Sequence, residues 1–200
     1  MKMCAYTLLL ALGATPFDQS LRQIARDQGG TASNSIDYLT PLTTVSQLLK
    51  DADYVVHAKV VSTNTMLTFD ERLVATEYTI LPLEVFKYRA SLNSSSKPGP
   101  LPPTVVRRIG GTVIEGEYRY ATSNSGVPEA EAPQVGDEVI WFLQYSEEER
   151  VFTFAGGPFG AFRVRDGNVH ALTRAVASRR GDQPVALDTF VRGLRAGAER

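Results

Sequence analysis

The chain has 200 residues, 43% of them apolar, and carries 21 basic against 22 acidic side chains. This length and this apolar fraction suit one domain with a substantial hydrophobic core. The near balance of charge excludes an electrostatic case for binding nucleic acid or an anionic membrane. The single cysteine, Cys4, excludes internal disulfides and cysteine-based zinc sites.

Residues 1–14 have the pattern of an export signal. Lys2 supplies a positive charge, residues 4–12 form an apolar stretch, and Gly13-Ala14 supply the small residues of a cleavage site. The stretch is shorter than the ~20 apolar residues of a membrane-spanning helix. We therefore expect a secreted or periplasmic protein whose mature chain lacks cysteine. The alternative is an apolar first strand or helix of the domain.

Residues 15–43 are expected to form an N-terminal extension or linker before a single domain, residues 44–200. Residues 20–28 predict a short helix that Ser20 caps and a Gly-Gly pair ends. The small, polar residues 29–35 have the composition of a linker.

A second helix is predicted to begin after Thr44. The Thr44 hydroxyl at the N-cap and Gln47 three residues later fit a capping box, which satisfies two amide groups at a helix start. One face of this helix would be apolar, made of Val45, Leu48, Leu49 and Ala52. The helix then leads directly into the first strand.

The remainder of the chain predicts short strands separated by turns. Pro82 falls inside one of them and indicates a bulge, an edge or a bend. Asp166-Gly167, between alternating apolar runs, predicts a tight hairpin. The expected strands are residues 54–61, 73–87, 104–109, 112–114, 118–120, 136–145, 152–154, and the two hairpin arms at 162–164 and 169–171. A last helix is expected from about Asp188, which would be its N-cap.

The segment 136–145 predicts a central strand. Every residue from Val139 to Leu143 is apolar, so the side chains on both faces of the strand are apolar. Both faces therefore need to be covered by other elements. We expect Ile140 and Phe142 to face the core of the domain. Trp141 is expected to face a covering helix, either residues 44–52 or residues 188–194.

Short strands with two or three small helices argue for a mainly β domain. A small OB-like barrel, closed or partly open, fits this pattern best, because closing the sheet removes exposed strand edges. The predicted fold therefore has one helix before the first strand and another at the C-terminus.

Four patches of the sequence carry a resemblance: Ala52 to Val60, Leu83 to Lys87, Val135 to Leu143 and Gly160 to Val164. Together they resemble a group of uncharacterised secreted bacterial proteins and the OB-type barrel of netrins and tissue inhibitors of metalloproteinases. The resemblance spans roughly residues 45 to 170 and implies a barrel fold and an extracellular setting. The inhibitors of that family act through an N-terminal cysteine and carry disulfides. The mature chain here has neither, so no inhibitory residue is carried over.

Motifs of catalysis are absent from the sequence: it has no Gly-x-Ser-x-Gly elbow, no His-Glu-x-x-His and no phosphate-binding loop. Of the two histidines, His57 falls inside a strand and His170 follows the hairpin turn, and both are expected to be structural. A hydrolase site around His57 or His170 is the enzymatic alternative. Glu147 to Glu149 are typical of a solvated turn, and neither a metal site nor a cofactor is expected.

One set of side chains joins arginines to aromatic rings. Arg163 and Arg165 alternate with Phe162 and Val164, so both arginines are expected to face outward. OB-type barrels bind nucleic acids or sugars through such combinations of cations and aromatic rings. The candidate binding residues are Arg107, Tyr118, Arg119, Tyr120, Arg163 and Arg165. The alternative is an ordinary solvated sheet face.

The sequence thus favours an exported, non-enzymatic interaction module that binds a protein or a cell-envelope component. Neither a nucleic-acid partner nor a membrane span is expected. A secreted hydrolase and an OB-type ligand binder are the alternatives. A hydrolase needs a histidine close to a nucleophile and an acid. A ligand binder needs the arginines to converge, and a protein binder needs an exposed apolar surface.

Overall fold

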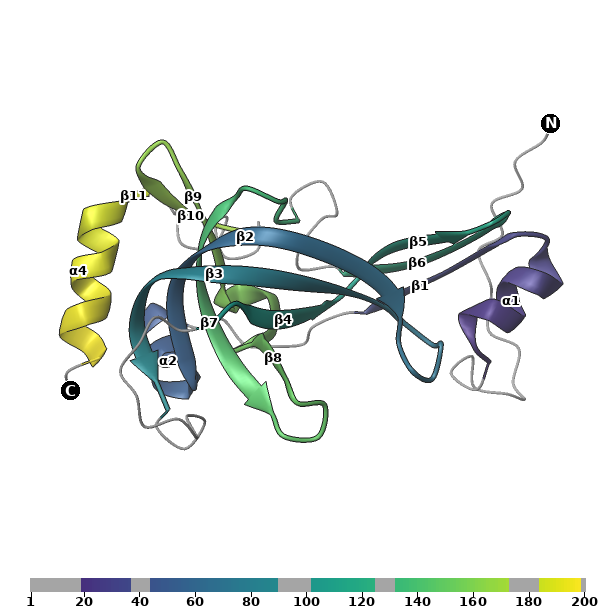
Figure 1. Cartoon of the computed structure of the whole chain (residues 1–200), viewed down its shortest axis with the longest axis horizontal. Coiled ribbons are helices and arrows are strands. Elements are labelled where there is room, and N and C mark those ends of the chain that lie inside the picture. The colour runs from purple at the N-terminus through teal and green to yellow at the C-terminus, as the bar shows by residue number, and fades with distance from the viewer. Residues whose placement is uncertain (1–18, 37–43, 90–101, 125–131, 173–183, 199–200) are drawn as a thin grey trace.

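The computed structural model describes residues 19–36, 44–89, 102–124, 132–172 and 184–198. Within these ranges the chain is mainly β, with an eight-stranded and a three-stranded sheet (Figure 1). The strands are β1 (Thr31–Ile36), β2 (Tyr54–Leu67), β3 (Val74–Tyr88), β4 (Thr104–Ile109), β5 (Gly111–Glu115), β6 (Tyr118–Asn124), β7 (Glu138–Ser146), β8 (Val151–Phe154), β9 (Ala161–Arg165), β10 (Asn168–Ala171) and β11 (Val185–Ala186). The helices are α1 (Leu21–Gln28), α2 (Val45–Asp51), the 3-10 turn η3 (Gly157–Gly160) and α4 (Leu187–Ala198). The predicted export signal lies outside the described residues.

Two of the three predicted helix starts, those capped by Ser20 and Thr44, are confirmed. The third is wrong, because α4 begins at Leu187 and Asp188 lies in its first turn and not at its N-cap. The Ser20 hydroxyl accepts a hydrogen bond from the Gln23 amide at 3.2 Å, and the Thr44 hydroxyl accepts one from the Gln47 amide at 3.0 Å. Each bond satisfies an amide that has no partner within the first turn of its helix. The Gln47 side chain completes no capping box, because it donates forward to the Asp51 carboxylate.

The prediction of a linker at residues 29–35 is wrong. Residues 31–36 form β1, which pairs in parallel with β6, and β6 pairs in turn with β5. Backbone pairing needs no apolar side chains, and only Ala32 of this polar strand is buried. A small apolar cluster of α1, β1, β3 and β6, with Leu21 and Tyr120 at its centre, holds this sheet together.

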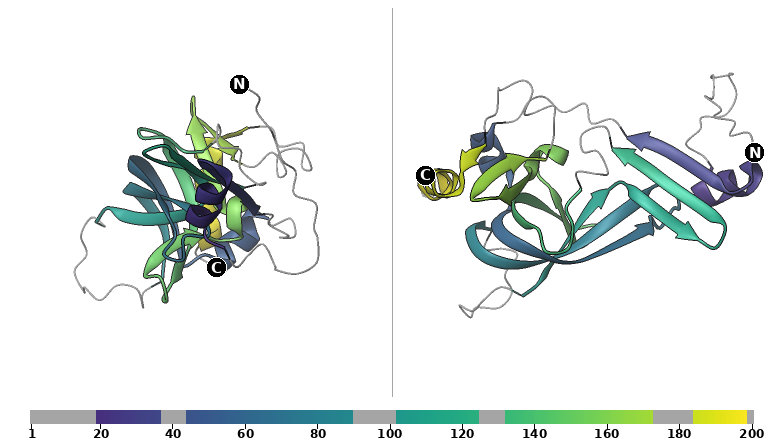
Figure 2. Two further views of the ribbon diagram at one scale, coloured as in Figure 1. Left: turned by 90° about the vertical axis from the view of Figure 1, so that its right-hand side faces the viewer. Right: turned by 90° about the horizontal axis from the view of Figure 1, so that it is seen from above.

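A long curved ribbon of β2 and β3 connects the two sheets (Figures 1 and 2). It pairs from Tyr54 with Tyr88 to Leu67 with Val74 and contains three register shifts. One shift lies where Ala58 pairs with Pro82, which confirms a bulge at the proline. The far end of the ribbon reaches the small sheet, where the Val74 amide donates to the Thr122 hydroxyl at 2.7 Å.

The eight-stranded sheet turns back on itself into a partial ring of strands. Its order is β11-β10-β9-β7-β2-β3-β4-β8, and β8 also pairs with β7. One edge of β7 pairs with β2, while the other edge is shared between two strands. Along that shared edge β9 pairs with Glu138 to Trp141, and β8 pairs with Leu143 to Ser146. The sheet therefore divides at Phe142, where β8 and β9 part from each other.

The ring is weakest between β4 and β8. These parallel strands share one paired position, Val106 with Phe152. Beyond this pair β4 continues to Ile109, while β8 continues to Phe154 and leads into η3. The separation of the two strands leaves the space that the candidate site occupies.

Both faces of β7 are buried, as predicted, but the assignment of the faces is wrong. Trp141 lies inside the ring with Val139 and Leu143, and Ile140 and Phe142 face the helices. The aromatic rings explain the inversion, because the Trp141 ring packs edge-on against Tyr78 and Phe154, with centroids 5.5 and 4.9 Å away. Strand alternation then directs its two neighbours outward.

The outer face of β7 is covered by two helices. Leu48 and Leu49 of α2 and Val191 and Leu194 of α4 join Phe142 and its neighbours in a second apolar cluster. Figure 2 shows α4 at the opposite end of the molecule from α1. Among the described residues, no helix has the length and apolar character needed to cross a membrane.

We expect Gly160→Ala to destabilise the protein, because Gly160 sits where β8 and β9 diverge from β7. A Cβ at this position would collide with the Ala155 carbonyl oxygen and lie 2.8 Å from the Phe142 carbonyl oxygen. Overpacking against backbone costs about 1–3 kcal/mol. Thermal unfolding followed by circular dichroism measures the effect.

Gly193→Ala is the matched control, because a Cβ on this residue of α4 meets nothing within 4 Å. This change should stabilise the helix by up to about 1 kcal/mol. Equal melting temperatures for Gly160→Ala and the wild-type protein would contradict the close packing at the branch.

Candidate functional site

A cavity of about 510 Å³ lies where β4 and β8 separate. We name it the β4–β8 pocket. It falls within the range of ~300–1,000 Å³ that is usual for small-molecule sites. Its lining comes from β4, the ends of β7 and β8, and η3: Arg107, Arg108, Ile109, Ser146, Glu149, Thr153, Phe154, Gly156, Gly157 and Pro158.

Arg107 lies on the outer face of β4, where two carboxylates neutralise it. Its Nη2 is 2.6 Å from Glu77 Oε1, and its Nη1 is 3.0 Å from Glu149 Oε2. Burial lowers the pKa of Arg107, but the hydrogen bonds and charges of the two glutamates outweigh burial and hold the pKa above its usual value. The charge of Arg107 is therefore already satisfied within the protein.

Arg108, the next residue, lies on the inner face of the same strand and is only 6% exposed. Its Nε and Nη1 are buried without a hydrogen-bond partner among the described residues. A guanidinium is always charged in proteins, and a buried charge without a partner costs several kcal/mol. Arg108 is thus a buried positive charge beside a cavity of ligand size.

Tyr78, an aromatic residue inside the ring, lies within the electrostatic range of Arg108. Burial raises the pKa of the Tyr78 hydroxyl, while the charges of Arg108 and Arg163 act in the opposite direction. Tyr78 contacts Trp141, whose buried Nε1 also has no hydrogen-bond partner in the described part of the chain. Phe154 therefore belongs both to the pocket wall and to the aromatic interior around Trp141.

The loop after β8 forms the opposite wall of the pocket. The Ala155 amide donates to the Phe142 carbonyl at 2.8 Å, which fixes this loop to β7. Gly156 then adopts a left-handed backbone with φ of 66°, which favours glycine, and Pro158 follows at the start of η3. These restraints hold the loop apart from β4.

The predicted arginine and aromatic residues are divided between the two sheets. Tyr118, Arg119 and Tyr120 lie on β6 of the three-stranded sheet, whereas Arg107 lies on β4 of the eight-stranded sheet. Arg119 is exposed, but Tyr120 is buried against α1. Of the six candidates, the structure brings only Arg107 to the β4–β8 pocket.

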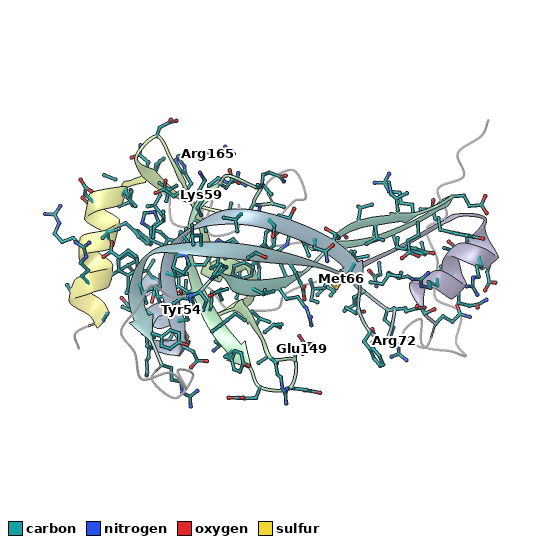
Figure 3. All side chains as sticks on the ribbon, in the orientation of Figure 1. Tyr54, Lys59, Met66, Arg72, Glu149 and Arg165 are labelled. Atoms are coloured by element: carbon teal, nitrogen blue, oxygen red, sulfur yellow. The ribbon has the colours of Figure 1, made fainter. Side chains whose placement is uncertain are left out.

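The prediction that Arg163 faces outward is wrong. This side chain is 6% exposed, and its Nη2 lies 3.0 Å from Asp137 Oδ2 and donates to the Ala132 carbonyl at 2.9 Å. The segment at residues 132–137 covers it, so the inner face of β9 is buried too. Arg165 is exposed at the β9–β10 turn, at the opposite edge of the molecule from Glu149 (Figure 3).

The two histidines lie apart from the β4–β8 pocket. His57 Nε2 is 2.5 Å from Glu138 Oε1, and His57 also borders a cavity of about 390 Å³ beneath α4 with Glu84 and Arg195. None of the hydrogen bonds between described residues joins a hydroxyl or thiol group to either imidazole. Among the described residues, His57 thus has an acid partner, Glu138, and no nucleophile hydrogen-bonded to it.

In the described parts of the chain, no three histidine, cysteine or acidic side chains come together to hold a metal ion. The turn at Glu147 to Glu149 is exposed, and Glu149 uses its carboxylate on Arg107.

No protein-family model matches the chain, and no curated protein matches its sequence.

The sequence contains one signal for the buried position of Arg108. Two consecutive arginines within a strand must point to opposite faces. In a sheet with one buried face, one of the two is therefore forced inward. Arg107 and Arg108 form such a pair. Val106 and Arg108 are both buried, so the face of β4 that they share points inward.

We expect Arg108→Met to stabilise the protein without ligand by about 1–3 kcal/mol, because it replaces an unpartnered buried charge with an apolar chain of similar reach. At roughly 2–4 °C per kcal/mol for a chain of this size, the melting temperature should rise measurably. Arg107→Met, which breaks two partly exposed ion pairs, should lower the stability by up to about 1 kcal/mol. Destabilisation by Arg108→Met would mean that Arg108 has a structural partner.

Proposed function

We propose that the protein is an exported, non-enzymatic binding module that takes a small molecule in the β4–β8 pocket. The observation that carries this proposal is Arg108, whose buried guanidinium has unpartnered nitrogens and borders a cavity of ligand size. Such a charge costs stability in the free protein. A ligand that compensates this charge gives the fold a reason to keep it, because native structures leave few buried polar groups unsatisfied.

The arrangement of strands supports an OB-like module. The five strands β2, β3, β4, β8 and β7 each pair with two others of the set. A five-stranded, partly open barrel is the architecture of the OB-fold, which binds ligands at the loop between its fourth and fifth strands. The corresponding turn here joins β7 to β8, and its Glu149 lines the pocket. The netrin-type resemblance belongs to the same proposal, without the inhibitory mechanism of that family.

Export is the second part of the proposal and rests on residues 1–14, with their charged start, apolar centre and small residues at 13 and 14. A secreted or periplasmic setting also suits a mature chain without cysteine. A hydrolase around His57 stays an alternative, for which the hydrogen bond with Glu138 is the relevant observation.

The neutral fluorophore N-phenyl-1-naphthylamine should bind to the purified protein near one-to-one, because the pocket has apolar walls at Ile109, Phe154 and Pro158. Thr153→Trp places a bulky ring in the pocket and should weaken this binding roughly tenfold or more. Fluorescence titration measures the affinity, and circular dichroism checks the fold.

Glu148→Trp is the matched control, because it adds the same ring on the exposed β7–β8 turn and outside the lining of the pocket. Equal loss of binding in both variants, or in neither, would contradict a small-molecule site between β4 and β8.

Binding of a protein or cell-envelope partner is a second candidate function, favoured by exposed aliphatic side chains on neighbouring strands. Leu81 and Leu83 of β3 are 43% and 54% exposed, and Val105 of β4 is 39% exposed. Val105 pairs with Thr79, two residues before Leu81, so Val105 and Leu81 share the outer face of the sheet. This surface is separate from Arg108, which points inward.

If this surface contacts the envelope, Leu83→Asp should lower the fraction of exported protein that sediments with it by about threefold or more, because a contact loses its apolar area. Val135→Asp, at a 59% exposed position before β7, is the control and should change nothing. Immunoblots of the envelope and released fractions measure the distribution. Identical distributions for Leu83→Asp and the wild-type protein would remove this candidate.

A further inference from the structure

We infer that the ligand of the β4–β8 pocket is an organic molecule with one negative charge, a carboxylate or sulfonate, on an apolar body. This inference rests on the proposed function, since it names the chemistry of a ligand for the same pocket. Three features of the described residues carry it: the balance of charge around the pocket, the kind of polar atom left unpartnered, and the character of the walls.

The balance of charge argues for an anion. On the outer face of β4, Arg107 is already paired with both Glu77 and Glu149, so its charge is not available to a ligand. On the inner face, Arg108 supplies a positive charge that neither glutamate contacts. An anion placed next to Arg108 neutralises the inner face, where the low dielectric strengthens the attraction.

The same arrangement limits the ligand to a single charge. Glu149 belongs to the lining of the pocket, and its side chain is 49% exposed at the turn after β7. A phosphate or a dicarboxylate would bring a second negative charge towards this carboxylate, against only one free cation among the described lining residues. Like charges at short range disfavour such a ligand.

The unpartnered atoms of the lining residue Arg108 are donors. Its Nε and Nη1 carry N–H groups, and the guanidinium has no acceptor. An ionised carboxylate or sulfonate offers acceptors only, so it complements this set. A hydroxyl or an amide would bring donors of its own. Charge-assisted hydrogen bonds of this kind are about twice as strong as neutral ones.

The walls select an apolar body. Ile109 closes the β4 side, and Phe154 and Pro158 close the side of β8 and η3. Phe154 stacks edge-on against Trp141, so its ring is held in place and gives a rigid wall. A cavity of about 510 Å³ exceeds the needs of an inorganic ion and accommodates one or two aromatic rings or a short aliphatic chain.

Two fluorescent probes separate the charge from the apolar body. 8-Anilinonaphthalene-1-sulfonate and N-phenyl-1-naphthylamine share the same ring system, and only the former carries a sulfonate. We expect the wild-type protein to bind the sulfonate roughly tenfold more tightly than the neutral probe, as for a hydrogen-bonded buried charge. Arg108→Met should abolish this preference and leave the affinity for the neutral probe within about threefold.

Arg165→Met is the matched control, because it removes an arginine that is exposed at the β9–β10 turn, is not part of the pocket lining, and lies far from Glu149 of that lining (Figure 3). This variant should keep the preference for the sulfonate. Arg108→Lys keeps the charge without the guanidinium and should keep part of the preference. Fluorescence titrations of all variants at one ionic strength give the affinities.

The measurements distinguish failure of the anionic ligand from failure of the binding site itself. If both probes bind equally well and Arg108→Met leaves the sulfonate affinity unchanged, the anionic ligand is wrong while the pocket remains a binding site. If Thr153→Trp affects neither probe, the binding site itself is wrong. Tighter sulfonate binding that is lost in Arg108→Met and kept in Arg165→Met supports both.

Discussion

The structure depends on β7, a strand buried on both faces whose second edge is shared between β8 and β9. Because both strands pair with this edge, they must part at Phe142, and Gly160 permits the close approach of backbone that results. One branch, β8, turns back towards β4 and nearly closes the ring. The other, β9, extends the sheet through β10 to α4. The opening beside η3, and hence the pocket, follows from this division.

The two arginines of β4 have opposite environments, although they are adjacent in the same strand. Alternation sends Arg107 to a partly solvated face, where Glu77 and Glu149 compensate it, and sends Arg108 inward. The inner face of the ring offers aromatic rings and donors, but no carboxylate that hydrogen-bonds the Nε or Nη1 of Arg108 among the described residues. A core built only for stability would carry an apolar residue at this position. Arg108 is therefore the residue whose presence packing does not explain.

The sequence predicted correctly those elements that depend on residues close together in the chain. The caps at Ser20 and Thr44, the bulge at Pro82 and the Asp166-Gly167 hairpin each depend on residues a few positions apart, and the structure contains all four. The failures concern partners distant in sequence. The polar strand β1 exists because β6 pairs with it, and Arg163 is buried because residues 132–137 lie over it. Hydrophobic periodicity contains no information about such partners.

By itself the sequence determined a mainly β fold, a central strand with two buried faces and a helix at each end of the strand-rich region. Periodicity and turn chemistry encode these features through neighbouring residues. Only the tertiary structure decided that Trp141 faces the ring, that β8 and β9 divide one edge of β7, and that Arg108 is buried beside a cavity. Each of these depends on which segments meet in space, because burial and pairing are properties of both partners and not of either sequence alone.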